Sequence, residues 1–90
     1  MKINDCEWDG WNVSHIGEHE VEPYEVEEVF ANRPFLRRAK EGKYLAYGQS
    51  RSGRYLTVVF AYRGQNRAYP ISARDATYKE KNYASIKKKK

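Results

Sequence analysis

The stretch from Arg54 to Arg74 constrains the fold more than any other, because its pattern is typical of two strands joined by a short turn. Apolar residues occupy both alternating sets of positions from Tyr55 to Tyr62, which predicts a central strand covered on both faces. Residues 64–66 have the composition of a hairpin turn. We therefore expect the chain to be organised around one β-hairpin with cationic side chains at its ends.

Periodicity and turn residues predict the remaining elements around this hairpin. Asp9 is a candidate N-cap, Pro23 suits the first turn of a second helix, and Thr77 with Glu80 has the spacing of a capping box. Pro70 cannot donate a hydrogen bond to a neighbouring strand, so we expect an edge position or a β-bulge there. The predicted strands are residues 3–8, 35–38, 43–48, 54–63 and 67–73, and the predicted helices are residues 11–19, 23–32 and 77–85.

The order of these elements defines the expected fold class. One strand, two helices, four strands and a last helix predict an α+β domain, with helices packed on a small antiparallel sheet. Ninety residues are enough for one hydrophobic core and too few for a second. We expect a single domain over residues 1–86, followed by a basic tail over residues 87–90.

Charge is unevenly distributed along the chain. Residues 1–30 contain one lysine and nine Asp or Glu, whereas residues 31–90 contain sixteen Lys or Arg and three Asp or Glu. The first third is therefore acidic and the rest is basic, with a net charge of +5 overall. A basic surface favours RNA or another anionic partner, although solvated charges without a partner produce the same pattern.

Cysteine usage and hydropathy narrow the expected compartment. Cys6 is the single cysteine, so no intramolecular disulfide can form, which fits a reducing environment. The opening residues lack the apolar segment of a secretory signal, and no apolar run approaches the ~18 residues of a membrane-spanning helix. We therefore expect a cytoplasmic protein with no membrane partner.

The register of the hairpin decides which cationic side chains meet. If Arg63 faces Arg67 across the turn, then Leu56 faces Arg74 on the two paired strands. Alternate residues of a strand point to opposite sides of a sheet, so this register turns Arg54 and Arg74 to the same side. We therefore expect these two arginines to act together.

The same register predicts a phosphate-binding cluster at one end of the hairpin, where the preceding loop and the start of the last helix also lie. Arginine offers bidentate donors that suit a phosphate better than those of lysine. The predicted cluster consists of Arg51, Arg54, Arg74 and Lys79, and Arg63 and Arg67 at the far end are expected to attract RNA more generally. For each single residue, a solvated strand end or a salt bridge to the acidic first third is the competing interpretation.

The two histidines, His15 and His19, are four residues apart on a predicted helix and can share one side of it. Three interpretations compete: a structural pair, a metal site and a pair for acid–base chemistry. A metal site lacks clear further ligands, because only Cys6 and Glu18 are nearby candidates. A histidine that moves a proton to or from a ribose or a leaving oxygen is the more interesting alternative, so we expect no metal.

Five short motifs, each present once, follow one another along the chain. They are Trp-Asp at residues 8–9, His-Ile-x-x-His-x-Val at 15–21, Glu-x-Glu-Glu-Val-Phe at 25–30, Arg-Tyr-Leu-x-Val-Val-Phe at 54–60 and Ile-Ser-Ala-Arg-Asp-Ala-Thr-x-x-Glu at 71–80. In this combination the chain resembles the BrnT family of toxins from bacterial type II toxin–antitoxin systems. The resemblance covers roughly residues 7–83, and the last motif is its most specific part.

The resemblance implies a small ribonuclease with a RelE-like fold. Such toxins cut RNA without a metal or other cofactor, by attack of a ribose 2′-oxygen on the adjacent phosphate. A cognate antitoxin, typically a ribbon–helix–helix protein, holds them inactive. The matching positions are His19 for proton transfer and Arg54 and Arg74 for the phosphate, with His15 and Tyr83 behind them.

Two positions depart from the family pattern. Many members have Lys-His-Gly where this chain has Glu18, His19 and Glu20, and Pro70 interrupts a strand that is usually continuous. Two added carboxylates beside His19 weaken any contact with a phosphate there. The alternative function is therefore a non-catalytic domain that binds nucleic acid or an antitoxin through a degenerate active site.

Overall fold

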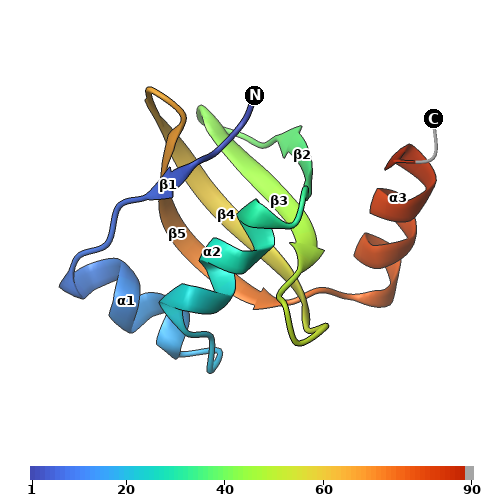
Figure 1. Ribbon diagram of the computed structural model, residues 1–90, viewed down its shortest axis with the longest axis horizontal. Coiled ribbons are helices and arrows are strands. Elements are labelled where there is room, and N and C mark those ends of the chain that lie inside the picture. Colours follow the sequence, from blue (N-terminus) through green and yellow to red (C-terminus); the bar gives the residue numbers. More distant parts are fainter. Residues whose placement is uncertain (89–90) are drawn as a thin grey trace.

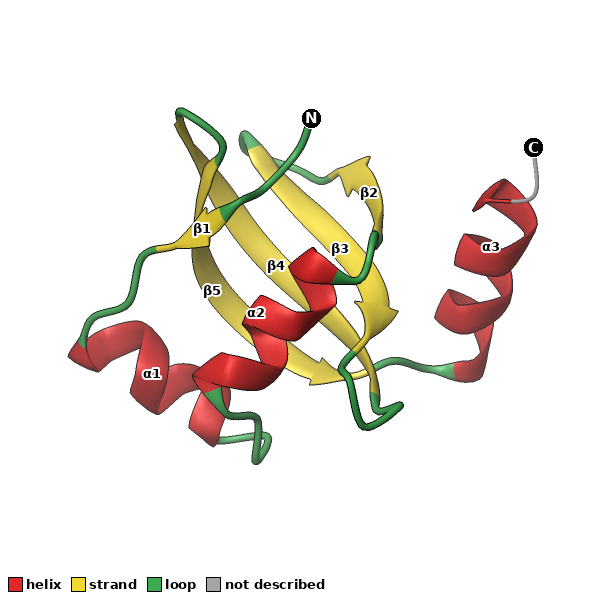
Figure 2. Ribbon diagram, viewed as in Figure 1, coloured by secondary structure: helices red, strands yellow, loops and turns green. Residues whose placement is uncertain are grey.

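The computed structural model describes residues 1–88, which form three helices and a five-stranded sheet (Figure 1, Figure 2). The predicted order of strands and helices is confirmed. The elements are β1 (Asp5–Cys6), α1 (Gly10–Gly17), α2 (Pro23–Ala31), β2 (Phe35–Arg38), β3 (Lys43–Gln49), β4 (Tyr55–Gly64), β5 (Arg67–Asp75) and α3 (Tyr78–Lys88).

The sheet is mixed, which corrects the expectation of a purely antiparallel one. Its strand order is β1-β5-β4-β3-β2, and the four strands from β2 to β5 pair antiparallel with their neighbours. β1 pairs parallel with β5, through Asp5 opposite Arg67 and Cys6 opposite Ala68. β1 and β5 are far apart in the chain, so no hairpin turn fixes their relative direction. The α+β class itself is confirmed.

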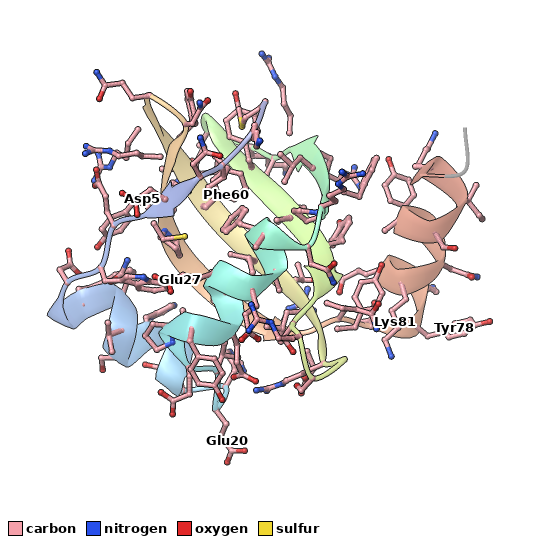
Figure 3. All side chains as sticks on the ribbon, in the orientation of Figure 1. Asp5, Glu20, Glu27, Phe60, Tyr78 and Lys81 are labelled. Carbon is pink, nitrogen blue, oxygen red and sulfur yellow. The ribbon has the colours of Figure 1, made fainter. Side chains whose placement is uncertain are left out.

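The two faces of the sheet are covered differently. α1 and α2 lie together over one face, whereas α3 stands at the far side beyond β3 and β2 (Figure 1). Phe60 of β4 is fully buried on the α2 side and meets Phe30 edge to face, with the ring centroids 5.1 Å apart. On the other face, the ring of Tyr83 from α3 packs against Tyr47 and Phe35. Figure 3 shows Phe60 inside the domain and Tyr78 directed outward from α3.

The helices begin at the predicted caps. The Asp9 side chain accepts a hydrogen bond from the backbone N–H of Asn12, and the Asn12 side chain accepts one from the N–H of Asp9. Pro23 occupies the first position of α2. Thr77 and Glu80 exchange hydrogen bonds of the same kind at the start of α3. Local sequence therefore sets where all three helices start.

The helix ends differ from the predictions, most clearly for α1 and α3. α1 ends at Gly17 rather than at residue 19, and Glu20 follows with a φ of 58°, so His19 lies in a turn. Lys87 and Lys88 continue α3 rather than begin a tail, and residues 89–90 of the predicted tail lie outside the described residues. No described helix is long and apolar enough to cross a membrane.

The central hairpin contains the bulge that Pro70 predicts. The predicted pairing of the two strands is observed in the middle of the hairpin, where Phe60 lies opposite Pro70 and Tyr62 lies opposite Ala68. The register shifts by one residue at two points, between Val59 and Phe60 and between Tyr62 and Gly64. The predicted pairing of Arg63 with Arg67 is wrong, because the second shift places Gly64 opposite Arg67. Pro70 has no N–H for the ladder, and its carbonyl oxygen accepts a hydrogen bond of 2.9 Å from the buried Asn12 side chain. Asn12 therefore helps to hold the bulge.

The shift changes which residues share a side of the sheet. Arg74 lies opposite Thr57 rather than Leu56. Since alternate residues of β4 face opposite sides, Arg74 lies on the Thr57 side and Arg54 lies on the Leu56 side. The prediction that Arg54 and Arg74 point to the same side is therefore wrong, because the bulge inserts one residue between the turn and Arg74.

Candidate functional site

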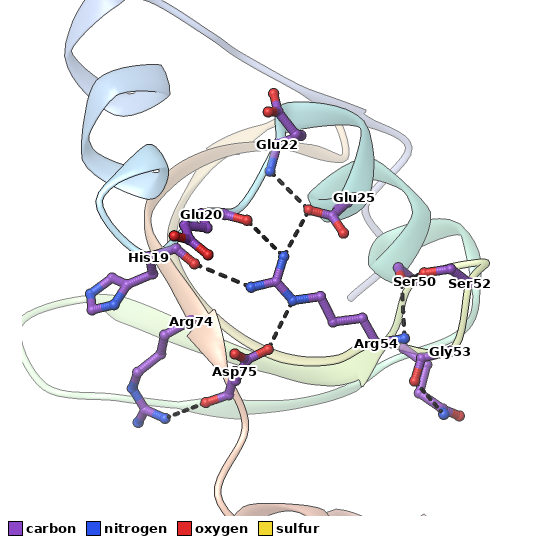
Figure 4. Close-up of polar contacts among 11 residues, drawn as sticks. His19, Glu20, Glu22, Glu25, Ser50, Ser52, Gly53, Arg54, Arg74 and Asp75 are labelled. Carbon is purple, nitrogen blue, oxygen red and sulfur yellow. Dashed lines mark hydrogen bonds and ion pairs between the residues drawn. The ribbon is translucent and has the colours of Figure 1, made fainter.

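Arg54 ties together three segments on the helix side of the sheet (Figure 4). Its Nε donates to the carboxylate of Asp75 at 2.8 Å, and its Nη1 donates to Glu25 of α2 at 3.0 Å. Nη1 and Nη2 also donate to the backbone carbonyls of Glu20 and His19, at 2.8 and 3.1 Å. Arg54 therefore connects the end of β5, the loop after α1 and the first turn of α2.

These contacts leave Arg54 little capacity for a ligand. A guanidinium has five N–H donors, and four of those of Arg54 are engaged. The hydrogen bond that Arg54 donates to Asp75 and the charges of Asp75 and Glu25 raise the pKa of Arg54, against the effect of burial. The Glu25 side chain is only 12% exposed and relies on Arg54 as its cationic partner. The arrangement is that of a structural clamp.

Arg74 lies at the end of β5 with one edge held and one edge open. Its Nη1 and Nη2 donate to the two carboxylate oxygens of Glu80, at 2.9 and 2.8 Å. Nη1 also donates to the backbone carbonyl of Asp75 at 3.1 Å (Figure 4). The Nε–H and the second Nη2–H, which form the other edge of the guanidinium, have no partner among the described residues. With 42% of its side chain exposed, Arg74 can still bind a ligand in a bidentate way.

Glu80 is the most heavily bonded carboxylate near Arg74. Besides the two bonds from Arg74, it accepts from the Thr57 hydroxyl at 2.8 Å and from the backbone N–H of Thr77 at 2.9 Å. These hydrogen bonds, the one from Arg74 above all, lower the pKa of Glu80 to about 2. The carboxylate is therefore ionised and fixed in place.

Asp75 joins the two arginines. Its carboxylate accepts from Arg54, while its backbone carbonyl accepts from Arg74. The hydrogen bond from Arg54, together with the charges of Arg54, Lys81 and His19, lowers the pKa of Asp75. Arg54 and Arg74 thus meet one residue from opposite sides of the sheet.

The cluster predicted at this end of the hairpin does not form on one side. The backbone N–H of Arg51 donates to Glu28, which places this loop residue against α2. Lys79 lies in the first turn of α3, on the other side of the sheet. Neither the Arg51 nor the Lys79 side chain has an ion pair within the described part of the chain. Their predicted contacts with RNA stay predictions.

At the far end of the hairpin, Arg63 and Arg67 share one acidic partner. Glu7 lies 3.3 Å from the Nε of Arg63 and 2.6 Å from the Nη2 of Arg67. Arg63 also lies over the ring of Tyr69, 4.9 Å from its centroid. These salt bridges to the acidic first third agree with the structural interpretation of the two arginines, and their attraction for RNA stays a prediction.

The two histidines lie in different settings. His15 belongs to α1, and its ring stacks on that of Trp11, with centroids 4.7 Å apart and planes 8° from parallel. His19 follows the helix and lies close enough to Asp75 to lower its pKa. Within residues 1–88 no three His, Cys, Asp or Glu side chains group as metal ligands. Burial, with Glu27 and Asp5 nearby, raises the pKa of the Cys6 thiol to about 12.

Comparison with known proteins identifies the family. The family model described as the ribonuclease toxin, BrnT, of type II toxin-antitoxin systems matches residues 8–80. The chain belongs to the BrnT family. The crystal structure of the Brucella abortus ribonuclease toxin BrnT is similar in fold, with a TM-score of 0.62 and 21% sequence identity over 81% of this chain and 96% of that one. A search of curated proteins finds no match.

Sequence reasoning missed the acidic half of this BrnT site. Glu80 was expected only to cap α3, and Thr57 only to occupy a strand, yet together they hold Arg74. Glu25 was not among the predicted site residues, yet it is 9% exposed and binds Arg54. The sequence feature that points to this contact is the capping box of Thr77 and Glu80. A glutamate in the first turn of α3 lies close to the end of the preceding strand, where Arg74 is.

Proposed function

We propose that this chain is an endoribonuclease toxin whose phosphate-binding group is the guanidinium of Arg74. The observation that carries the proposal is the open Nε–Nη2 edge of Arg74, whose opposite edge is held by Glu80. Two parallel N–H donors match two oxygens of a phosphodiester. Membership of a family of ribonuclease toxins supports RNA as the substrate class.

The proposed reaction is attack of a ribose 2′-oxygen on the adjacent phosphorus, with cleavage of the bond to the 5′-oxygen of the next nucleotide. Negative charge builds on the non-bridging oxygens, and Arg74 stabilises it. His19, which lies near Asp75, is our candidate for proton transfer, and we assign His15 a supporting role through α1. We assign no step to a metal or another cofactor.

We assign Arg54 to the architecture of the site rather than to the phosphate. Its single unused N–H cannot bind two phosphate oxygens in parallel. By holding Asp75 and the carbonyls of His19 and Glu20, it sets the relative position of β5 and the loop that carries His19. Substitution of Arg54 is therefore expected to act on the fold first and on activity as a consequence.

The protein partner that we propose is a cognate antitoxin of the ribbon–helix–helix class. The type II toxin–antitoxin family supports an antitoxin partner in general. The class of antitoxin rests on the sequence resemblance alone. Co-expression with the protein encoded by the adjacent gene tests it, because a ribbon–helix–helix partner forms a stable complex that binds DNA.

The test of the ribonuclease proposal is induced expression in a bacterial host, with growth and RNA integrity followed over time. The wild type is expected to arrest growth and degrade RNA. Arg74→Ala is expected to abolish both while the protein still folds, with a lower melting temperature because Glu80 loses its cationic partner. Arg38→Ala, which removes an exposed arginine of β2 outside the proposed site, is the matched control and is expected to stay toxic.

The alternative is a binding domain with a degenerate active site, which the carboxylates of Glu18 and Glu20 beside His19 favour. A soluble, folded wild type that leaves growth and RNA intact contradicts the ribonuclease proposal. RNA binding without cleavage, with an affinity that falls steeply as salt rises, then supports the binding domain. An Arg74→Ala variant that unfolds makes Arg74 structural and removes it from the site.

A further inference from the structure

Resting on the proposed function, we propose that Glu80 is a positioning residue for Arg74. In this arrangement the carboxylate holds the Nη1–Nη2 edge of the guanidinium, and the Nε–Nη2 edge is left oriented for a phosphate. Glu80 itself does not touch the RNA. Glu80 thus has a second role besides its part in the capping box of α3.

The geometry of the pair supports orientation rather than simple charge pairing. Glu80 binds Arg74 through both carboxylate oxygens, at 2.9 and 2.8 Å, and such a parallel pair fixes the plane of the guanidinium. Nη1 is further fixed by the carbonyl of Asp75. Three of the five N–H donors are engaged, and the two that remain lie on one edge. An arginine on a flexible side chain without these contacts would lose more conformational entropy on binding a phosphate.

Glu80 is itself held from two sides. The Thr57 hydroxyl, on a residue only 2% exposed, donates to it across from β4, and the backbone N–H of Thr77 donates from the start of α3. A chain of contacts therefore runs from the rigid centre of the sheet through Thr57 and Glu80 to Arg74. Its first member lies in the longest strand of the domain.

The opposite interpretation is that Glu80 competes with the phosphate and keeps Arg74 inactive. Binding of a phosphate would then require Glu80 to break its two hydrogen bonds with Arg74. Thr57 and Thr77 would still hold the Glu80 carboxylate in its place. A phosphate need not displace it, because the second edge of Arg74 is already open. The two interpretations predict opposite effects of Glu80→Gln, since a competitor that is weakened raises activity and a positioning group that is weakened lowers it.

The experiment measures steady-state cleavage of a short RNA and binding of its 2′-O-methyl analogue, which cannot be cleaved. Glu80→Gln places an N–H against Arg74 and is expected to lower kcat/KM by about tenfold to a hundredfold. Thr57→Val is expected to lower it in the same direction, and Thr57→Ser, which keeps the hydroxyl, to restore most of it. Thr77→Ala breaks the helix cap and leaves the Glu80 carboxylate in contact with Arg74, so it lowers stability with kcat unchanged. Glu41→Gln removes an exposed acid that pairs with Lys43 and is the charge control.

The outcomes distinguish the positioning role of Glu80 from the ribonuclease activity of the protein. Glu80→Gln with unchanged or higher kcat/KM overturns the positioning role while the ribonuclease proposal stands. A wild type that binds the analogue without cleaving RNA overturns the ribonuclease proposal, and weaker binding by Glu80→Gln then supports the positioning role. If Glu80→Gln does not fold, Thr57→Val decides: an unchanged kcat with an unchanged affinity for the analogue overturns the inference. A wild type that neither binds nor cleaves overturns both.

Discussion

Replacement of Arg54 by alanine is the most informative single change, because it separates a structural arginine from a catalytic one. The variant loses four hydrogen bonds, to Asp75, to Glu25 and to the carbonyls of His19 and Glu20. The contributions of these partners differ with their exposure. Asp75 is 71% exposed and its ion pair contributes little, since water and salt replace the lost partner.

The larger cost comes from Glu25. Its side chain is 12% exposed, so the carboxylate keeps its charge in a poorly solvated position once Arg54 is gone. Its one remaining hydrogen bond comes from the N–H of Glu22. Breaking a buried pair by removing one partner costs about 3–5 kcal/mol, and partial exposure places this case near the lower end. We expect a loss of about 3 kcal/mol in the free energy of unfolding, and a fall in melting temperature of about 10–20 °C.

Urea unfolding and thermal melting measure this directly. Arg54→Lys keeps the positive charge but cannot make the four hydrogen bonds of the guanidinium. Its free energy of unfolding is expected to lie between those of the wild type and Arg54→Ala. Arg51→Ala removes an exposed arginine without an ion pair in the described chain and is expected to stay within about 0.5 kcal/mol of the wild type. An Arg54→Ala protein that unfolds like the wild type but no longer cleaves RNA would refute the reasoning and return Arg54 to the catalytic group.

Three further predictions concern stability. Because the pKa of Glu80 falls from 4.5 to about 2 on folding, the stability that Glu80 contributes is fully present above about pH 4.5 and is lost as the pH falls towards 2. A shift of this size corresponds to about 3 kcal/mol, and solvent screening of the partly exposed pair with Arg74 reduces it, so acid unfolding of Glu80→Gln should lack about 2 kcal/mol of this pH dependence. Asn12→Ala leaves the carbonyls of Glu7 and Pro70 without their donor and should cost about 2–3 kcal/mol in urea unfolding. Gly48→Ala would bring its Cβ to 3.0 Å from that of Pro34 and should lower the free energy of unfolding by about 1–3 kcal/mol, measured in the same way.

Much of the fold follows from local patterns in the sequence. Asp9, Pro23 and Thr77 mark the three helix starts, because each satisfies or omits a backbone donor that a helix start leaves free. The apolar run of β4 marks the centre of the sheet, and Phe60 is fully buried there. The parallel pairing of β1 was not predictable from its two residues, since so short a strand carries no periodicity.

The candidate site was less predictable because it depends on the partners of each cation. Eight arginines and nine lysines are visible in the sequence, but the acids that engage them come from distant segments. Glu7 reaches Arg63 and Arg67, and Glu25 reaches Arg54. A cluster of positive charge in the sequence therefore overstates the number of donors that a phosphate can use.

The bulge at Pro70 shows how one residue can divide a predicted site in two. Pro70 predicts an edge position or a bulge, whereas the predicted register of the hairpin assumes two straight strands and so lacks the one-residue shift that a bulge imposes. With the shift, Arg74 turns to the side of Thr57, where Glu80 can hold it, and Arg54 turns to the side of α2, where Glu25 holds it. A straight β5 would place both arginines on the same side of the sheet. The proline that departs from the family pattern is thus compatible with the proposed phosphate site, because the bulge turns Arg74, with its Nε–Nη2 edge unpaired among the described residues, to the side of the sheet opposite Arg54.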